Sequence, residues 1–131
     1  MPRPPSPHPT PLELQILKIL WQQAPLMARD VQAALADAGK PLAKTSVITM
    51  LNTMFDKKYV SRKRQGNSYL FSPRVREEQV ASQMLDDVVD RVFDGSTAAV
   101  MLSLFDAREL DKQELQELRR RIDERLKETD S

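Results

Sequence analysis

The sequence predicts a mostly α-helical fold that carries one β-hairpin, and three observations support this prediction. Apolar residues recur at helical spacing in three segments of residues 10–58. Two short strand-like runs around a Gly-Asn turn follow in residues 59–73. Helical spacing then returns over residues 75–131. Three helices followed by a hairpin predict a winged helix-turn-helix unit over 10–74, and we expect residues 75–131 to form a helical dimerisation region.

Composition limits the possible functions. The chain has 131 residues, of which 40% are hydrophobic, so it can form one compact domain with a helical appendage. It has no cysteine, which excludes disulfides and thiolate metal sites, and a single histidine, His8, which disfavours histidine-rich metal sites and a serine–histidine–aspartate triad. A glycine-rich phosphate loop is also absent from the sequence. We therefore expect no metal, no cofactor and no enzymatic activity.

The N-terminal segment 1–9 contains five prolines and no apolar periodicity, so we expect a disordered tail. It lacks the apolar core of a signal peptide, and no apolar stretch in the chain approaches the roughly 20 residues that span a bilayer. These features favour a cytoplasmic protein.

Charge is distributed unevenly along the chain. Residues 1–76 contain 12 Lys or Arg and 4 Asp or Glu, a net charge of +8. Residues 77–131 contain 8 and 15 of these, a net charge of −7. A basic front half beside an acidic back half is expected when one part contacts polyanionic DNA and the other does not. The alternative is chance segregation of charges among solvated faces.

The first two helices have recognisable ends. Thr10 can cap a helix, Pro11 suits its first turn, and Glu13 can return to the cap. This helix ends before Pro25, and a second helix is predicted over 28–38, where Gly39 follows as a C-terminal stop.

The third predicted helix, residues 44–58, is the candidate recognition helix for a DNA major groove. We expect its buried stripe to consist of Val47, Ile48, Leu51, Met54 and Phe55. Its candidate DNA-contacting side chains lie largely off that stripe: Lys44, Thr45, Ser46, Thr49 and Asn52. For each of these residues alone, an ordinary solvated surface position is an equally good interpretation.

The hairpin predicts a basic finger. Three consecutive cations, Arg62, Lys63 and Arg64, lead into a turn that contains Asn67. Such a finger can lie along phosphates or enter a minor groove. The alternative is an edge strand that its charges protect from aggregation. Because a helix-turn-helix pattern directly precedes it, we favour the DNA-binding role.

The back half predicts a helix over about 75–93, a short helix over 97–105 and a last helix that begins at Asp111. Residues 98–105 are apolar on nearly every side, so a helix there requires a cover. A second copy of the segment is the simplest cover, and a self-contained three-helix bundle is the alternative. The candidate dimerisation residues are Val88, Val89, Val92, Val100, Met101, Leu104, Phe105, Leu115, Leu118 and Ile122.

Several segments resemble one known family, the penicillinase repressors (the BlaI/MecI/CopY family). The segments 10–21 and 42–51 are similar to its opening helix and its recognition helix. The end of the wing, 69–73, the segment 93–96 and the last-helix segment 114–119 are similar as well. The resemblance covers about residues 10–126.

This resemblance implies a bacterial, homodimeric transcription repressor that binds pseudo-palindromic operators in double-stranded DNA. In many members a membrane sensor protease partner triggers cleavage in the dimerisation region and so relieves repression, and in the best-known members the cut falls between Asn and Phe. The matching pair here is Ser103-Leu104, which departs from that pattern. The cysteine cluster of the copper-responsive branch is absent from the sequence, so that mode of sensing is not expected.

Our functional hypothesis is repression by occlusion of a promoter. The alternative from another class is a winged-helix module that binds an acidic protein partner within a larger assembly.

Overall fold

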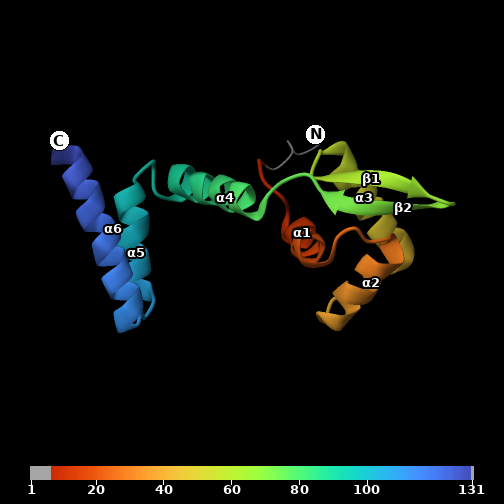
Figure 1. Cartoon of the computed structure of the whole chain (residues 1–131), viewed down its shortest axis with the longest axis horizontal. Helices are drawn as coiled ribbons and strands as arrows, with labels where there is room; N and C mark the ends of the chain where they lie inside the picture. The colour runs from red at the N-terminus through yellow and green to blue at the C-terminus, as the bar shows by residue number, and fades with distance from the viewer. Residues whose placement is uncertain (1–6, 131) are drawn as a thin grey trace. The chain divides into compact units, whose positions relative to one another are not determined.

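The computed structural model describes residues 7–130, which form six helices and one two-stranded antiparallel sheet (Figure 1). This confirms the mostly helical winged helix-turn-helix prediction. The elements in chain order are α1 (Pro11–Gln23), α2 (Ala28–Asp37), α3 (Lys44–Asp56), β1 (Val60–Gln65), β2 (Ser68–Pro73), α4 (Glu77–Val92), α5 (Thr97–Ala107) and α6 (Lys112–Asp130).

The chain divides into two compact units, one ending at Asp87 and the other beginning at Val88. This division lies later than the boundary we predicted at residue 74. The difference arises because the first turns of α4 pack on the first unit, where Val80 is buried and Met84 lies against the core.

The core of the first unit lies among the three helices and the hairpin. Ile16, Leu17 and Leu20 of α1 are buried. The other buried apolar residues are Val31, Leu35, Val47, Leu51, Met54, Val60, Phe71 and Val80. Each fully buried side chain of this size contributes about 1.5–3 kcal/mol of transfer free energy, so this cluster holds the helices in position.

α1 begins at the predicted capping box. The Thr10 hydroxyl accepts from the backbone N–H of Glu13 at 3.3 Å, and the Glu13 carboxylate accepts from the Thr10 N–H at 2.9 Å. Both bonds satisfy N–H groups that the helix itself leaves unpaired. Gly39 has a φ of 84° after α2, a backbone conformation that suits glycine, as its predicted role as a stop requires.

The hairpin pairs β1 with β2 in a register that places Arg62 opposite Phe71. Gly66 has a φ of 61° in the two-residue turn, which glycine adopts without steric cost. The linker between α1 and α2 joins the hairpin through Leu26, whose N–H donates to the Phe71 carbonyl at 3.0 Å. The hairpin is therefore held to the helices by backbone pairing as well as by side chains.

The structure differs from the expected disordered tail at residues 7–9. Pro9 is buried, and the His8 ring lies 3.3 Å from the Asp87 carboxylate of α4. Burial of Pro9 gives this segment an anchor that its composition alone does not reveal. The rest of the predicted tail, residues 1–6, lies outside the described residues.

Neither α5 nor α6 contains a buried residue, although mean hydropathy is high in α5. Met101 is 59% exposed, Leu102 is 64% exposed and Phe105 is 46% exposed. Both helices are capped: the Ser96 hydroxyl accepts from the Ala99 N–H before α5, and the side chains of Asp111 and Glu114 each accept from the other's backbone N–H at the start of α6. Among the helices of residues 7–130, none has the length and apolar character needed to cross a membrane.

The exposed arginines of α6 are balanced within the helix. Arg120 donates to Glu117 and Glu124, and Arg121 donates to Glu117. The hydrogen bonds that Glu117 accepts lower its pKa to about 2, and the bond from Arg120 has a larger effect than the bond from Arg121. This surface is a solvated network of i,i+3 and i,i+4 pairs.

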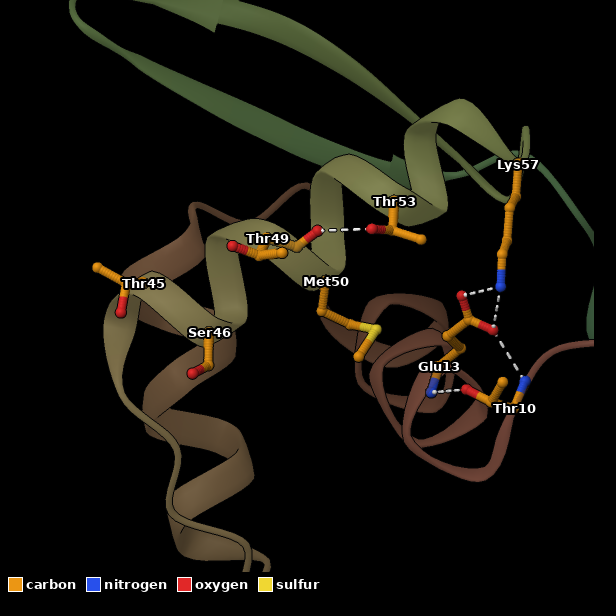
Figure 2. Close-up of a pocket in the computed structure, with 8 residues that line it drawn as sticks. All are labelled: Thr10, Glu13, Thr45, Ser46, Thr49, Met50, Thr53 and Lys57. Carbon is orange, nitrogen blue, oxygen red and sulfur yellow. Dashed lines mark hydrogen bonds and ion pairs between the residues drawn. The ribbon is translucent and has the colours of Figure 1, made fainter. Parts of the chain in front are cut away.

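An ion pair between a buried carboxylate and a half-buried lysine joins the start of α1 to the end of α3. The Glu13 side chain is 1% exposed, and the Lys57 ammonium lies 2.9 Å from its Oε2 and 3.2 Å from its Oε1 (Figure 2). The same carboxylate caps α1, so one side chain serves both contacts. Partial burial raises the pKa of Tyr59, and the nearby negative charge of Glu13 raises it further.

We predict that Lys57→Met lowers the free energy of unfolding by about 1–3 kcal/mol, because the buried Glu13 carboxylate then lacks its cation. Glu13→Gln retains a capping oxygen but removes the charge, so the double variant should recover part of the loss. Urea unfolding of the wild-type protein, the two single variants and the double variant, all at one protein concentration, measures the four free energies of this double-mutant cycle. Strict additivity of the two single changes would contradict the coupling.

Candidate nucleic-acid interface

The outer face of α3 is polar and open. Val47, Leu51 and Met54 are fully buried on the opposite side of the helix, and this orients the remaining side chains outward. Lys44, Thr45, Ser46 and Thr49 are exposed, and Asn52 is half-buried beside the hairpin. Figure 2 shows Thr45, Ser46, Thr49 and Thr53 along this helix. The Thr53 hydroxyl donates to the Thr49 carbonyl at 3.0 Å.

Ile48 does not belong to the buried stripe, contrary to our prediction. It is 38% exposed and lies on the side of α3 that faces the hairpin. Successive residues of a helix are rotated by about 100°, so Ile48 points away from the side of α3 on which its neighbour Val47 is buried. The buried stripe is therefore narrower than the apolar pattern predicts. Phe55 follows Ile48 by seven residues and therefore lies on nearly the same side of α3, where it is half-buried with Arg62 over its ring.

A groove of about 470 Å³ separates α3 from the hairpin. Lys44, Ile48 and Asn52 line it from α3, and Arg29 lines it from the first turn of α2. The hairpin side consists of Arg62, Asn67, Ser68, Tyr69 and Phe71. Arg29 and Ile48 were not among our candidate site residues, because only the tertiary fold brings them beside the predicted contacts.

Arg62 is not an exposed tip of a basic finger. Its guanidinium carbon lies 4.0 Å from the centre of the Phe55 ring and 4.7 Å from that of Tyr69. Its Nη1 donates to Oδ1 of Asn52 at 3.0 Å. Side chains alternate between the two faces of a strand, so Arg62 faces α3 while its neighbour Lys63 faces away.

The other predicted hairpin residues are exposed. Lys63, Arg64 and Asn67 lie at or near the turn, and Arg64 Nε donates to the Gly66 carbonyl at 3.1 Å. Two of the three consecutive cations are therefore open to a partner, and the third ties the hairpin to α3. Tyr69 is 37% exposed beside this junction.

A second groove of about 450 Å³ runs along the other flank of α3 (Figure 2). Thr45, Ser46 and Thr49 line it together with Met50. The Glu13–Lys57 pair closes its end near α1. The exposed polar face of α3 thus lies between two grooves, and its side chains are accessible from both of them.

The candidate dimerisation residues lie at the end of α4, in α5 and in α6. Val88, Val92, Met101, Leu104, Phe105, Leu115 and Ile122 are exposed, and Val89, Val100 and Leu118 are half-buried. Leu85, Leu102 and Leu126 are exposed large apolar residues that we did not predict. The Ser103-Leu104 pair lies within α5, and both residues are exposed.

A core-anchored helix with an open polar face, followed by a hairpin with cations near its turn, defines the DNA-binding unit of a winged-helix transcription regulator. A family model described as penicillinase repressor matches residues 9–124. The chain belongs to the penicillinase repressor family. It is accordingly a DNA-binding transcription regulator and not an enzyme.

Two individual proteins are similar to the chain. The penicillinase repressor of Bacillus licheniformis is 20% identical over 112 residues, which are 86% of this chain and 87% of that protein. A MarR/EmrR family transcriptional regulator from Acinetobacter sp. ADP1 has a TM-score of 0.40 and 16% identity, over 92% of this chain and 75% of that one. A structural likeness of that size adds nothing to the family match.

Proposed function

We propose that the chain acts as a homodimeric repressor that binds a pseudo-palindromic operator in double-stranded DNA and thereby occludes a promoter. The observation that carries this proposal is the combination of an open polar face on α3 with a second unit whose large apolar side chains are exposed. The first feature suits a major groove, and the second requires a partner.

The DNA half of the proposal rests on the residues around α3. Lys44 and Lys63 are exposed cations that can neutralise phosphates, and Thr45, Ser46 and Thr49 can donate hydrogen bonds. Ala43 supplies no side-chain cap at the start of α3, so a phosphate oxygen can accept from the first N–H groups of the helix.

The dimer half rests on α5. Met101, Leu102 and Phe105 are each at least 46% exposed, and an apolar helix of this kind is costly to leave in water. An identical segment from a second chain provides a self-complementary cover with two-fold symmetry. The two recognition helices can then bind successive major grooves about 34 Å apart.

Proteolytic relief by a membrane sensor protease is the third part of the proposal. A cut between Ser103 and Leu104 would divide α5 in the middle of the proposed dimer face. Because both residues are helical, the protease must unwind α5 locally before it can cut. A regulator of this kind acts on the chromosome, so we place it in the cytoplasm.

We predict that Lys63→Ala and Lys44→Ala each weaken binding to a duplex and reduce the slope of log affinity against log salt by about 1. The reason is the loss of one phosphate contact per substitution. Fluorescence anisotropy with the promoter fragment of the protein's own gene, at several salt concentrations, measures both quantities.

Lys112→Ala is the matched control, since Lys112 is an exposed cation of α6 in the other unit. If all three substitutions reduced the affinity and the salt slope equally, DNA binding would depend only on the net charge of the protein and not on the positions of Lys44 and Lys63. Failure of the wild-type protein to shift any promoter fragment in low salt would favour the protein-interaction alternative.

We predict that Met101→Glu weakens self-association by at least about thirtyfold, because it places a charge in the centre of the proposed dimer face. Met101 is exposed within its own chain, so the substitution should leave each subunit folded. Operator affinity should fall about a hundredfold, since the link between half-sites is lost.

Sedimentation equilibrium and circular dichroism measure the association and the fold. Gln116→Glu adds the same charge at an exposed polar position of α6 and serves as the control. A wild-type protein that stays monomeric at micromolar concentration would refute the dimer.

A further inference from the structure

The junction between α3 and the hairpin restricts what Asn52 can recognise. Arg62 donates to Oδ1 of Asn52 at 3.0 Å. A guanidinium has only donors, so the atom of the carboxamide that faces it must be the oxygen. The Nδ2 group, which carries two N–H donors, is consequently at the other end of the carboxamide.

Arg62 is held firmly enough to maintain this orientation. Phe55 of α3 and Tyr69 of β2 lie on it at 4.0 Å and 4.7 Å, well within the range of cation–π attraction. Both rings restrict the guanidinium plane, and the hydrogen bond to Asn52 restricts its rotation. Arg62 is thus a positioning residue that acts through Asn52.

Asn52 lies where a base edge would enter. It lines the groove between α3 and the hairpin together with Ile48 and Lys44, which lie one turn and two turns before it on the same side of the helix. Its carboxamide therefore borders the space that a major-groove edge occupies in the proposed complex. This step rests on the proposed function, since it assumes that α3 binds DNA.

The geometry points to Asn52 as a donor-only reader of a guanine rather than a bidentate reader of an adenine. Bidentate adenine recognition requires the amide oxygen to accept from the base N6 amino group while the amide nitrogen donates to N7. Here one of the two lone pairs of that oxygen already accepts from Arg62, so the oxygen is turned toward the hairpin and the two N–H groups are the free end of the amide. Guanine presents two acceptors, N7 and O6, and so suits an amide whose free end carries the N–H groups.

The test compares base preferences of variants by sequencing bound duplexes from a randomised pool. The wild-type protein should select guanine at one position of each half-site, and Asn52→Ala should lose the preference at that position alone. Arg62→Met, which fills the space between the rings but cannot donate, should reduce the guanine-over-adenine preference by about tenfold. Arg62→Lys retains a donor and should retain more of the preference.

Lys63→Met is the matched control, because the neighbouring cation is exposed and its loss should weaken binding to all sequences alike. A uniform loss with Arg62→Met, at an unchanged base profile, would make Arg62 a phosphate contact and overturn the inference. Selection of adenine at the Asn52 position by the wild-type protein would overturn it as well. If the wild-type protein selects no sequence at all, the proposed function fails instead.

A measurement on the DNA side avoids any dependence on variant folding. The guanine is replaced by 7-deazaguanine, which lacks N7, or by 2-aminopurine opposite thymine, which lacks O6. At least one replacement should weaken binding of the wild-type protein by about tenfold. Unchanged affinity for both duplexes would refute the donor-only contact.

Discussion

The structure depends on the packing of one face of α3 into the core of the first unit. Val47, Leu51 and Met54 have no exposed surface, and the helical period therefore directs the polar side chains to the opposite face. The Glu13–Lys57 pair adds a charged contact at the end of this helix and joins it to the cap of α1. The proposed DNA-binding surface is thus the far side of a packed core, which holds its side chains in place.

Much of the fold could be predicted because its determinants are local. The Thr10 and Asp111 caps, the Gly39 stop and the Gly66 turn are each decided by residues within a few positions of one another. The apolar period decides the helices in the same way. Boundaries between units are different, since only packing shows that Val80 draws the start of α4 into the first unit.

The candidate site was less predictable, because the orientation of a side chain depends on contacts distant in sequence. The run of three cations indicated a basic hairpin, but the register against β2 and the position of Phe55 decide that Arg62 turns inward. Ile48 resembles a core residue by type, and only its angle around α3 places it in the groove. Arg29 reaches the same groove from α2, with no pattern in the sequence to indicate it.

The exposed apolar residues of α5 have a consequence for dosage. If only paired chains occupy an operator, the amount of active species rises with the square of the chain concentration while most chains are single. A modest change in synthesis or turnover then produces a disproportionate change in promoter occupancy. A steep response of this kind would need no effector pocket, because mass action on the proposed pairing through α5 would supply it.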